Sequence, residues 1–136
     1  MGVLSDFIIA TEPEALEYFQ DRDSISEDIL HWKSFSHVEL STLLAILNGK
    51  PWDKSLLRLF PNVTHSEESW LTRVADELLE RLSVAGYDLD KAAAAWAATD
   101  EMRCTPAEAR DAIEELAKFA ARAKELGKPV YLWNCL

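Results

Sequence analysis

The sequence predicts an α+β fold that is mostly helical, with about six helices and a small ribbon formed by two terminal strands. Over the middle of the chain, apolar side chains recur at spacings of three and four residues, which is typical of amphipathic helices. Both ends of the chain instead carry short, apolar segments with strand propensity. A chain of 136 residues has the size of one ordinary domain, so we expect residues 1–136 to form a single globular domain.

The ends of the expected helices are marked by residues that suit specific helix positions. Gly49, Gly86 and Gly127 each follow a segment of helical periodicity, and glycine favours the left-handed conformation that ends many helices. Five Ser/Thr-x-x-Glu motifs match the capping box, in which each side chain accepts a hydrogen bond from the other residue's backbone N–H. These motifs begin at Thr11, Ser24, Ser36, Thr64 and Thr105.

These marks and the periodicity divide the chain into helices. The segment 37–48 is apolar on nearly every side, so we expect it to be the buried central helix. Two alternatives remain open for residues 24–35, which form either a short helix or a segment that is extended at 32–35. The other expected helices are 12–20, a short one at 52–60, a long amphipathic one at 66–85, one from Asp88 or Asp90 to Ala98, and 106–126.

The two expected strands are residues 3–10 and 129–135. Each is short and apolar, and the second follows a Gly-Lys-Pro sequence that ends the preceding helix. A lone buried strand leaves its backbone N–H and C=O groups without partners, which is costly. We therefore expect the two strands to pair with each other as a ribbon that packs on the helices.

The charge of the chain limits its partners. The formal net charge is −10 and the pI is about 4.7, and no two basic residues are adjacent. Nucleic acids and anionic membranes are usually met by a basic face, so we expect neither as a partner. The longest apolar run, 92–98, is too short to span a bilayer. The acidic balance agrees with a basic protein partner, and equally with the plain solubility of many bacterial-type proteins.

Two acidic or aromatic segments are candidates for contact with such a partner. The first gathers four acidic residues around an expected turn, and the second places a tryptophan and an aspartate directly after a Gly-Lys-Pro turn. Tryptophan is enriched at interface hot spots, although it also fills cores, and acidic runs are often only solvated. The candidate residues are Asp21, Asp23, Glu27, Asp28, Trp52 and Asp53.

The sequence lacks the patterns that mark common catalytic and cofactor sites. No metal-ligand spacing, no nucleophile elbow and no cluster of glycines for phosphate binding is present, so we expect no cofactor, metal or catalytic residues. Cys104 precedes the helix expected at 106–126, where the helix dipole favours a thiolate, and it is a candidate reactive thiol or else an ordinary loop cysteine. The start of the chain does not resemble a secretion signal, so we expect a cytoplasmic protein with reduced Cys104 and Cys135.

These observations favour a non-catalytic protein-binding function, for example an inhibitor or immunity-like protein that blocks a basic partner through its acidic surface. One alternative is an enzyme or small-ligand-binding protein whose site is assembled from dispersed residues. Another alternative is a homo-oligomeric structural protein. The dispersed candidates are His31, His37, Asp53, His65 and Cys104.

Overall fold

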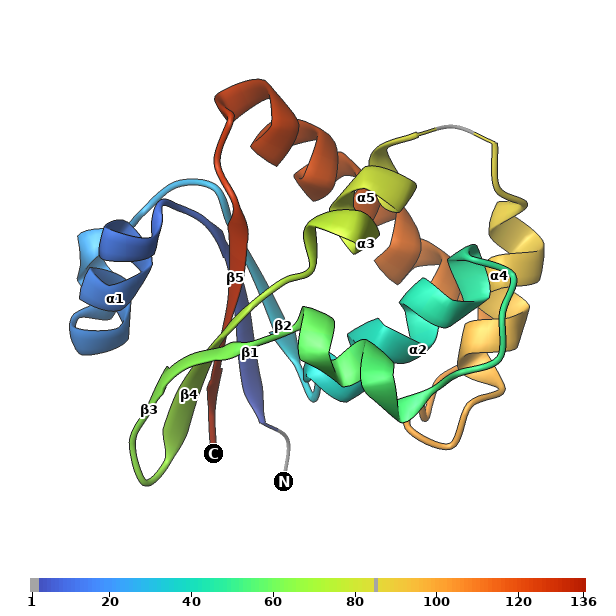
Figure 1. The fold of residues 1–136 in the computed structure, drawn as a ribbon, viewed down its shortest axis with the longest axis horizontal. Helices are drawn as coiled ribbons and strands as arrows, with labels where there is room; N and C mark the ends of the chain where they lie inside the picture. The colour runs from blue at the N-terminus through green and yellow to red at the C-terminus, as the bar shows by residue number, and fades with distance from the viewer. Residues whose placement is uncertain (1–2, 85) are drawn as a thin grey trace.

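A five-stranded antiparallel sheet forms the middle of the computed structural model, which describes residues 3–84 and 86–136 (Figure 1). Along the sheet the strands follow the order β2-β1-β5-β4-β3. The strands are β1 (Leu4–Ile9), β2 (Ile29–Lys33), β3 (Asn62–His65), β4 (Ser69–Arg73) and β5 (Val130–Cys135). The helices are α1 (Glu12–Gln20), α2 (His37–Leu47), α3 (Asp76–Ser83), α4 (Leu89–Ala97) and α5 (Pro106–Leu126), with 3-10 turns η1 (Arg22–Ser24) and η2 (Lys54–Leu59).

The predicted two-stranded terminal ribbon is wrong, because the terminal strands are the centre of a larger sheet. β1 and β5 pair with each other from Leu4 opposite Cys135 to Ile9 opposite Val130. Each also pairs with a second strand, β1 with β2 and β5 with β4. The sheet, rather than a central helix at 37–48, is therefore the element around which the other elements are arranged.

The long helix predicted at 66–85 is also wrong. A hairpin of β3 and β4 occupies its first half, closed by the bond from Ser66 N to Ser69 O at 2.8 Å, and only α3 is helical. Leu71 and Val74 fall at helical spacing, but they pack in separate cores on opposite faces of the sheet. Ala85, where the helix was expected to end, lies outside the described residues, as do Met1 and Gly2.

Helices cover both faces of the sheet. On one face α2, α3, α4 and α5 enclose the larger core, in which Phe7 and Leu132 of the central strands meet Leu43, Trp96 and Ile113 of the helices (Figure 1). On the other face α1 covers a smaller core of seven buried residues. Among the described residues, no helix combines the length and the apolar character needed to cross a membrane.

Three of the five expected capping boxes are formed. Thr11, Ser36 and Thr105 each accept a hydrogen bond from the first turn of α1, α2 and α5, and the glutamate three residues later completes each box. Ser24 instead ends η1, and Thr64 lies within β3. The motif is too short to distinguish a helix start from other local structure, and residues 29–33, where a short helix was one alternative, form β2.

Whether a hydroxyl caps a helix predicts how much its removal lowers the free energy of unfolding. Thr105→Ala removes the hydrogen bond to the Glu108 N–H at the start of the longest helix, so we expect the free energy of unfolding to fall by about 1 kcal/mol. Ser24→Ala removes no helix cap and should cost less than about 0.5 kcal/mol. Urea denaturation of both variants measures this, and equal losses would contradict the assignment.

Candidate functional site

A groove of about 390 Å³ lies between β2 and the N-terminal half of α5. Aromatic and apolar side chains form its floor, and three acidic residues of α5 stand along it at positions i, i+3 and i+7, which share one side of a helix. The floor consists of Trp32, Phe35, Met102, Cys104 and Ala112, the acidic residues are Glu108, Asp111 and Glu115, and Lys33 also lines the groove.

The aromatic floor belongs to a connected row of rings. Trp32 meets Phe7 at 5.3 Å in an edge-to-face arrangement and Phe35 at 4.6 Å, measured between ring centroids. Phe35 in turn lies 5.8 Å from the buried Trp96. The Trp32 indole N–H donates a hydrogen bond to a Glu115 carboxylate oxygen at 2.9 Å. These contacts hold the ring of Trp32 between the core and α5, so the floor is formed before any ligand arrives.

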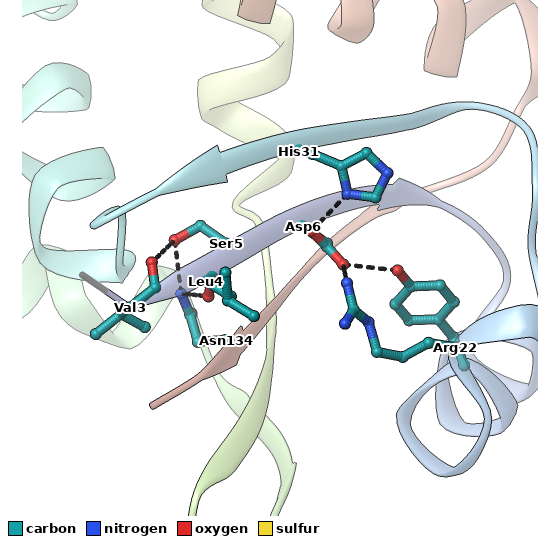
Figure 2. Close-up of polar contacts among 8 residues, drawn as sticks. Val3, Leu4, Ser5, Asp6, Arg22, His31 and Asn134 are labelled. Carbon is teal, nitrogen blue, oxygen red and sulfur yellow. Dashed lines mark hydrogen bonds and ion pairs between the residues drawn. The ribbon is translucent and has the colours of Figure 1, made fainter. Parts of the chain in front are cut away.

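A buried polar cluster fixes the loop that carries Phe35. The Asn134 Nδ2 group donates hydrogen bonds to the Phe35 carbonyl oxygen at 2.6 Å and to Ser5 Oγ at 3.1 Å, and Ser5 Oγ also accepts from the Phe35 N–H at 3.0 Å. Ser5 and Asn134 are completely buried, and Figure 2 shows them side by side on β1 and β5. The two central strands therefore position one wall of the groove directly.

The three carboxylates of the groove differ in whether they already have a hydrogen-bond partner. Glu115 accepts the indole N–H of Trp32, while Glu108 accepts the backbone N–H of Thr105, which holds the pKa of Glu108 below its usual range. Within the described part of the chain, Asp111 has neither a hydrogen-bond nor an ion-pair partner. An uncompensated carboxylate beside aromatic rings suits a cation that has an apolar stem.

Cys104 lies in this groove, but its surroundings oppose a reactive thiolate. Burial and the negative charge of Glu108 raise the pKa of the Cys104 thiol. The direction is opposite to the lowered pKa that the helix dipole alone predicts. The main reason is that burial disfavours the charged thiolate. In addition, the Thr105 capping box places the Glu108 carboxylate at the same helix end, where its charge offsets the dipole.

A second polar cluster lies on the opposite face of β1, around the buried Asp6 (Figure 2). One Asp6 carboxylate oxygen contacts His31 Nδ1 at 2.7 Å, and the other accepts hydrogen bonds from the Tyr18 hydroxyl at 2.7 Å and from Arg22 at 2.6 Å. Burial raises the pKa of Asp6, but the hydrogen bonds from His31, Tyr18 and Arg22 outweigh it and hold the pKa below its ordinary value. Burial and the bond to Asp6 raise the pKa of Tyr18 to about 12.

This cluster attaches α1 and η1 to the sheet. The Arg22 guanidinium lies 4.1 Å from the ring centroid of Trp133 on β5, while Tyr18 comes from α1 and His31 from β2. Both carboxylate oxygens of Asp6 are occupied by these donors, so the carboxylate is not free to bind a ligand. Its role in the structure is to join three elements around one buried charge.

Two of the four acidic residues predicted for partner contact in the segment 21–28 already bind other groups of the fold. Asp21 caps η1 by accepting the backbone N–H of Asp23 at 3.0 Å, and Asp28 forms an ion pair with Arg122 of α5 at 3.2 Å. Asp23 and Glu27 are exposed. The segment therefore offers a smaller free charge than its composition suggests.

Trp52 and Asp53 lie on the other side of the sheet from that segment, because η2 packs against α2 whereas η1 packs against α1 (Figure 1). Trp52 is 45% exposed, and its indole N–H donates to Ser41 Oγ at 2.9 Å. The Asp53 carboxylate accepts the Ser55 N–H and caps η2, which lowers its pKa. The two predicted partner segments do not form one surface.

The dispersed residues of the enzyme alternative come from separate elements. His31 and His65 lie on the two opposite edge strands, which are four strand spacings or about 19 Å apart. His37 begins α2 with its Nδ1 buried and unpartnered, while Asp53 caps η2 and Cys104 lines the groove. In residues 3–84 and 86–136, no three His, Cys, Asp or Glu side chains are grouped to hold a metal ion.

The sequence analysis missed most residues of the Asp6 cluster and of the groove. It did not single out Asp6, Tyr18 or Arg22, nor the carboxylates of α5. The available signal was the position of Asp6, a charged residue directly before the apolar run 7–10 of an expected strand. Such a residue is buried only if it is paired, and its partners come from three other elements that the sequence does not place near it.

Comparisons with protein-family models, with curated proteins and with solved structures give no match for this chain. The functional interpretation therefore depends on the chain's own geometry. Compared with the Asp6 cluster, the groove combines open volume with the unpaired carboxylate of Asp111. We therefore take the groove as the candidate binding site.

The Asp6 cluster predicts a pH-dependent stability. Because the pKa of Asp6 in the fold lies below its ordinary value of 3.8, the carboxylate stabilises the fold above that value, and this contribution is lost as the pH falls through the folded-state pKa. We expect Asp6→Asn to lower the free energy of unfolding by about 3 kcal/mol at pH 7 and by progressively less as the pH falls below 3.8. Urea denaturation over a series of pH values from 7 downward measures the difference. The exposed Asp23→Asn variant is the control, and a cost for Asp6→Asn that does not change with pH would contradict this account.

The raised pKa of Cys104 predicts slow alkylation. In a Cys135→Ser background, we expect iodoacetamide at pH 7 to modify Cys104 more slowly than it modifies glutathione, because less of the thiol is ionised. Glu108→Gln keeps the capping geometry and removes the negative charge, so it should increase the rate a few-fold. Mass spectrometry of the modified peptide gives both rates, and a rate above that of glutathione would contradict this expectation and support the reactive-thiol hypothesis.

Proposed function

We propose that this protein is a non-catalytic binding module for a basic protein partner, and that the groove between β2 and α5 takes up a cationic side chain of that partner. The observation that carries the proposal is the uncompensated carboxylate of Asp111 beside a preformed floor of Trp32 and Phe35. Two further carboxylates, from Glu108 and Glu115, stand on the same side of α5.

The chemistry of this groove favours an arginine side chain over a lysine side chain. A guanidinium group is planar, stacks on aromatic rings and forms two parallel hydrogen bonds with a carboxylate, whereas an ammonium group acts as a compact point charge. The aliphatic part of an arginine also suits an apolar floor that includes Met102 and Ala112. A volume of about 390 Å³ is at the lower end of ligand sites and accommodates one such side chain.

The net charge of −10 supports the same partner chemistry at longer range. An acidic surface accelerates encounter with a basic protein and disfavours acidic competitors. An inhibitor or immunity-like protein uses this attraction to cover the basic surface of its target. Within this proposal, Trp52 and the exposed residues of the segment 21–28 are additional contact candidates on other faces of the molecule.

The proposal predicts that a small arginine probe binds at the groove. When N-acetyl-arginine-N-methylamide is titrated into the ¹⁵N-labelled protein, the amide resonances of residues 32–35 and 102–115 should shift in a saturable way. Asp111→Asn should weaken this binding by about fivefold, since it removes one charge that faces the ligand. The measurement is the dissociation constant from the resonance shifts.

Asp21→Asn is the matched control, because it removes the same charge from the acidic segment 21–28 and keeps a side-chain oxygen for the cap of η1. It should leave binding of the arginine probe unchanged. N-acetyl-norleucine-N-methylamide, which lacks the cation, should not saturate the same resonances. If Asp21→Asn weakens binding as much as Asp111→Asn, the attraction is a general effect of net charge and the groove is not the site.

A further inference from the structure

β2 is an edge strand with one free side. β1 directs alternate residues to its two neighbours, β2 and β5. Two bonds at the ends of the β1–β2 pair show which residues face β2: Ser34 N donates to Val3 O at 2.6 Å, and Ile9 N donates to Asp28 O at 3.3 Å. In the continuous register between these two bonds, the even-numbered residues of β2 direct their backbone groups toward β1. The residues whose N–H and C=O groups point away from the sheet are therefore Ile29, His31 and Lys33.

The free side of β2 is open to a further strand. Among the described residues, β1 is the only strand that pairs with β2, and α5 contacts β2 through side chains on one face, as Trp32 does with Glu115. The opposite edge is less suitable, because β3 has four residues and a register irregularity between Asn62 and Thr64. Bulges and short strands are features that block pairing at sheet edges, and β2 has an uninterrupted register over all five of its residues.

One side of α5 runs along this open edge, with carboxylates near the Trp32 end of β2 and the cation of Arg122 near the Asp28 end. At one end of β2, Asp28 pairs with Arg122, and near the other end Trp32 donates to Glu115. Leu30 and Trp32 point to the same face of the sheet as α5, and Ile29 points to the face covered by α1. A strand added beside β2 would therefore send every second side chain to the α5 face, and the residue opposite Trp32 would lie next to the groove and its carboxylates.

We propose that β2 receives an extended basic segment of the partner as an additional antiparallel strand, with cationic side chains at alternate positions on the α5 face and the one opposite Trp32 in the groove. This inference rests on the function proposed above and specifies how the partner binds. We specify the antiparallel direction because every pair in this sheet is antiparallel and such pairing is slightly more stable per residue. Addition of a peptide strand to an open sheet edge is a common recognition mode, in which the backbone supplies affinity and alternate pockets supply specificity.

The charge of the protein argues against a second copy as the occupant of this edge. Pairing of β2 with β2 of another copy would bring together two chains that each carry a net charge of −10, with their α5 carboxylates near the shared edge. A basic segment instead places positive charge beside those carboxylates. Charge complementarity therefore selects the basic partner.

The register makes a specific prediction about peptides. Residues of the added strand that lie opposite Ile29, His31 and Lys33 exchange backbone hydrogen bonds with β2, and their side chains point to the α1 face. Residues opposite Leu30 and Trp32 direct their side chains to the α5 face, where the groove lies beside Trp32, and their N–H groups away from β2. The cationic side chains and the bonding N–H groups thus belong to alternating residues of the segment.

Four peptides of equal charge test this arrangement against the ¹⁵N-labelled full chain. The parent is acetyl-Thr-Arg-Thr-Arg-Thr-amide, and the reordered acetyl-Thr-Thr-Arg-Arg-Thr-amide places its two arginines on opposite sides of a strand. N-methylation of the central threonine of the parent removes a bonding N–H, whereas N-methylation of its second arginine removes an N–H that points outward. We expect the reordered and threonine-methylated peptides to bind about tenfold more weakly than the parent, and the arginine-methylated peptide within about threefold of it.

The parent peptide should also slow hydrogen exchange of the His31 amide, which single arginine probes should not do. If both methylated peptides bind like the parent while Asp111→Asn weakens all of them, strand addition is wrong and the groove function stands. If neither the peptides nor the arginine probe binds, the proposed function itself is wrong. If the β2 resonances shift with protein concentration in the absence of peptide, a second copy occupies the edge and the inference is overturned.

Discussion

Backbone hydrogen bonding of the two central strands determines how the other elements of the fold are arranged. β1 and β5 are buried between two layers of helices, where an unpaired N–H or C=O group cannot reach water. β1 meets this requirement by directing alternate residues to β2 and to β5, while β5 lies between β1 and β4. The two ends of the chain must therefore meet in the middle of the sheet, and the helices on each face pack against that pair of strands.

Two consecutive residues of β1 connect this sheet to the layers on either side. Ser5 faces the larger core, where it and Asn134 hold the loop that contains Phe35, and Asp6 faces the smaller core, where it binds Tyr18 and Arg22 (Figure 2). Buried polar groups of this kind stabilise a fold only when their partners are in place, and their loss leaves costly unpaired groups. The alternation of side chains along a strand thus lets one short segment fix both the groove wall and the position of α1.

β2 combines an open sheet edge with a neighbouring acidic and aromatic groove. As an edge strand it presents unpaired backbone groups, and as the neighbour of α5 it lies beside carboxylates and aromatic rings. Backbone pairing alone is insensitive to sequence, and an acidic groove alone is insensitive to the conformation of its ligand. In the proposed strand addition, the two together would select for an extended conformation and for positive charge at defined spacing, which is the basis of specificity in strand-addition interfaces.

Local sequence patterns were sufficient to place the helices whose ends carry strong capping signals. α1 and α5 have the boundaries expected from Thr11, Thr105 and Gly127, because capping and left-handed glycine conformations depend on neighbouring residues only. The hairpin at 62–73 follows from long-range contacts, since Leu71 and Val74 suit helical spacing equally well and pairing with β5 selects the strand conformation. The groove and the Asp6 cluster were equally hidden, because each joins residues separated by long stretches of chain, such as Trp32 with Glu115 and Asp6 with His31. Local propensity is set within a few residues, whereas strand pairing and side-chain partners depend on which distant segments the whole chain brings together.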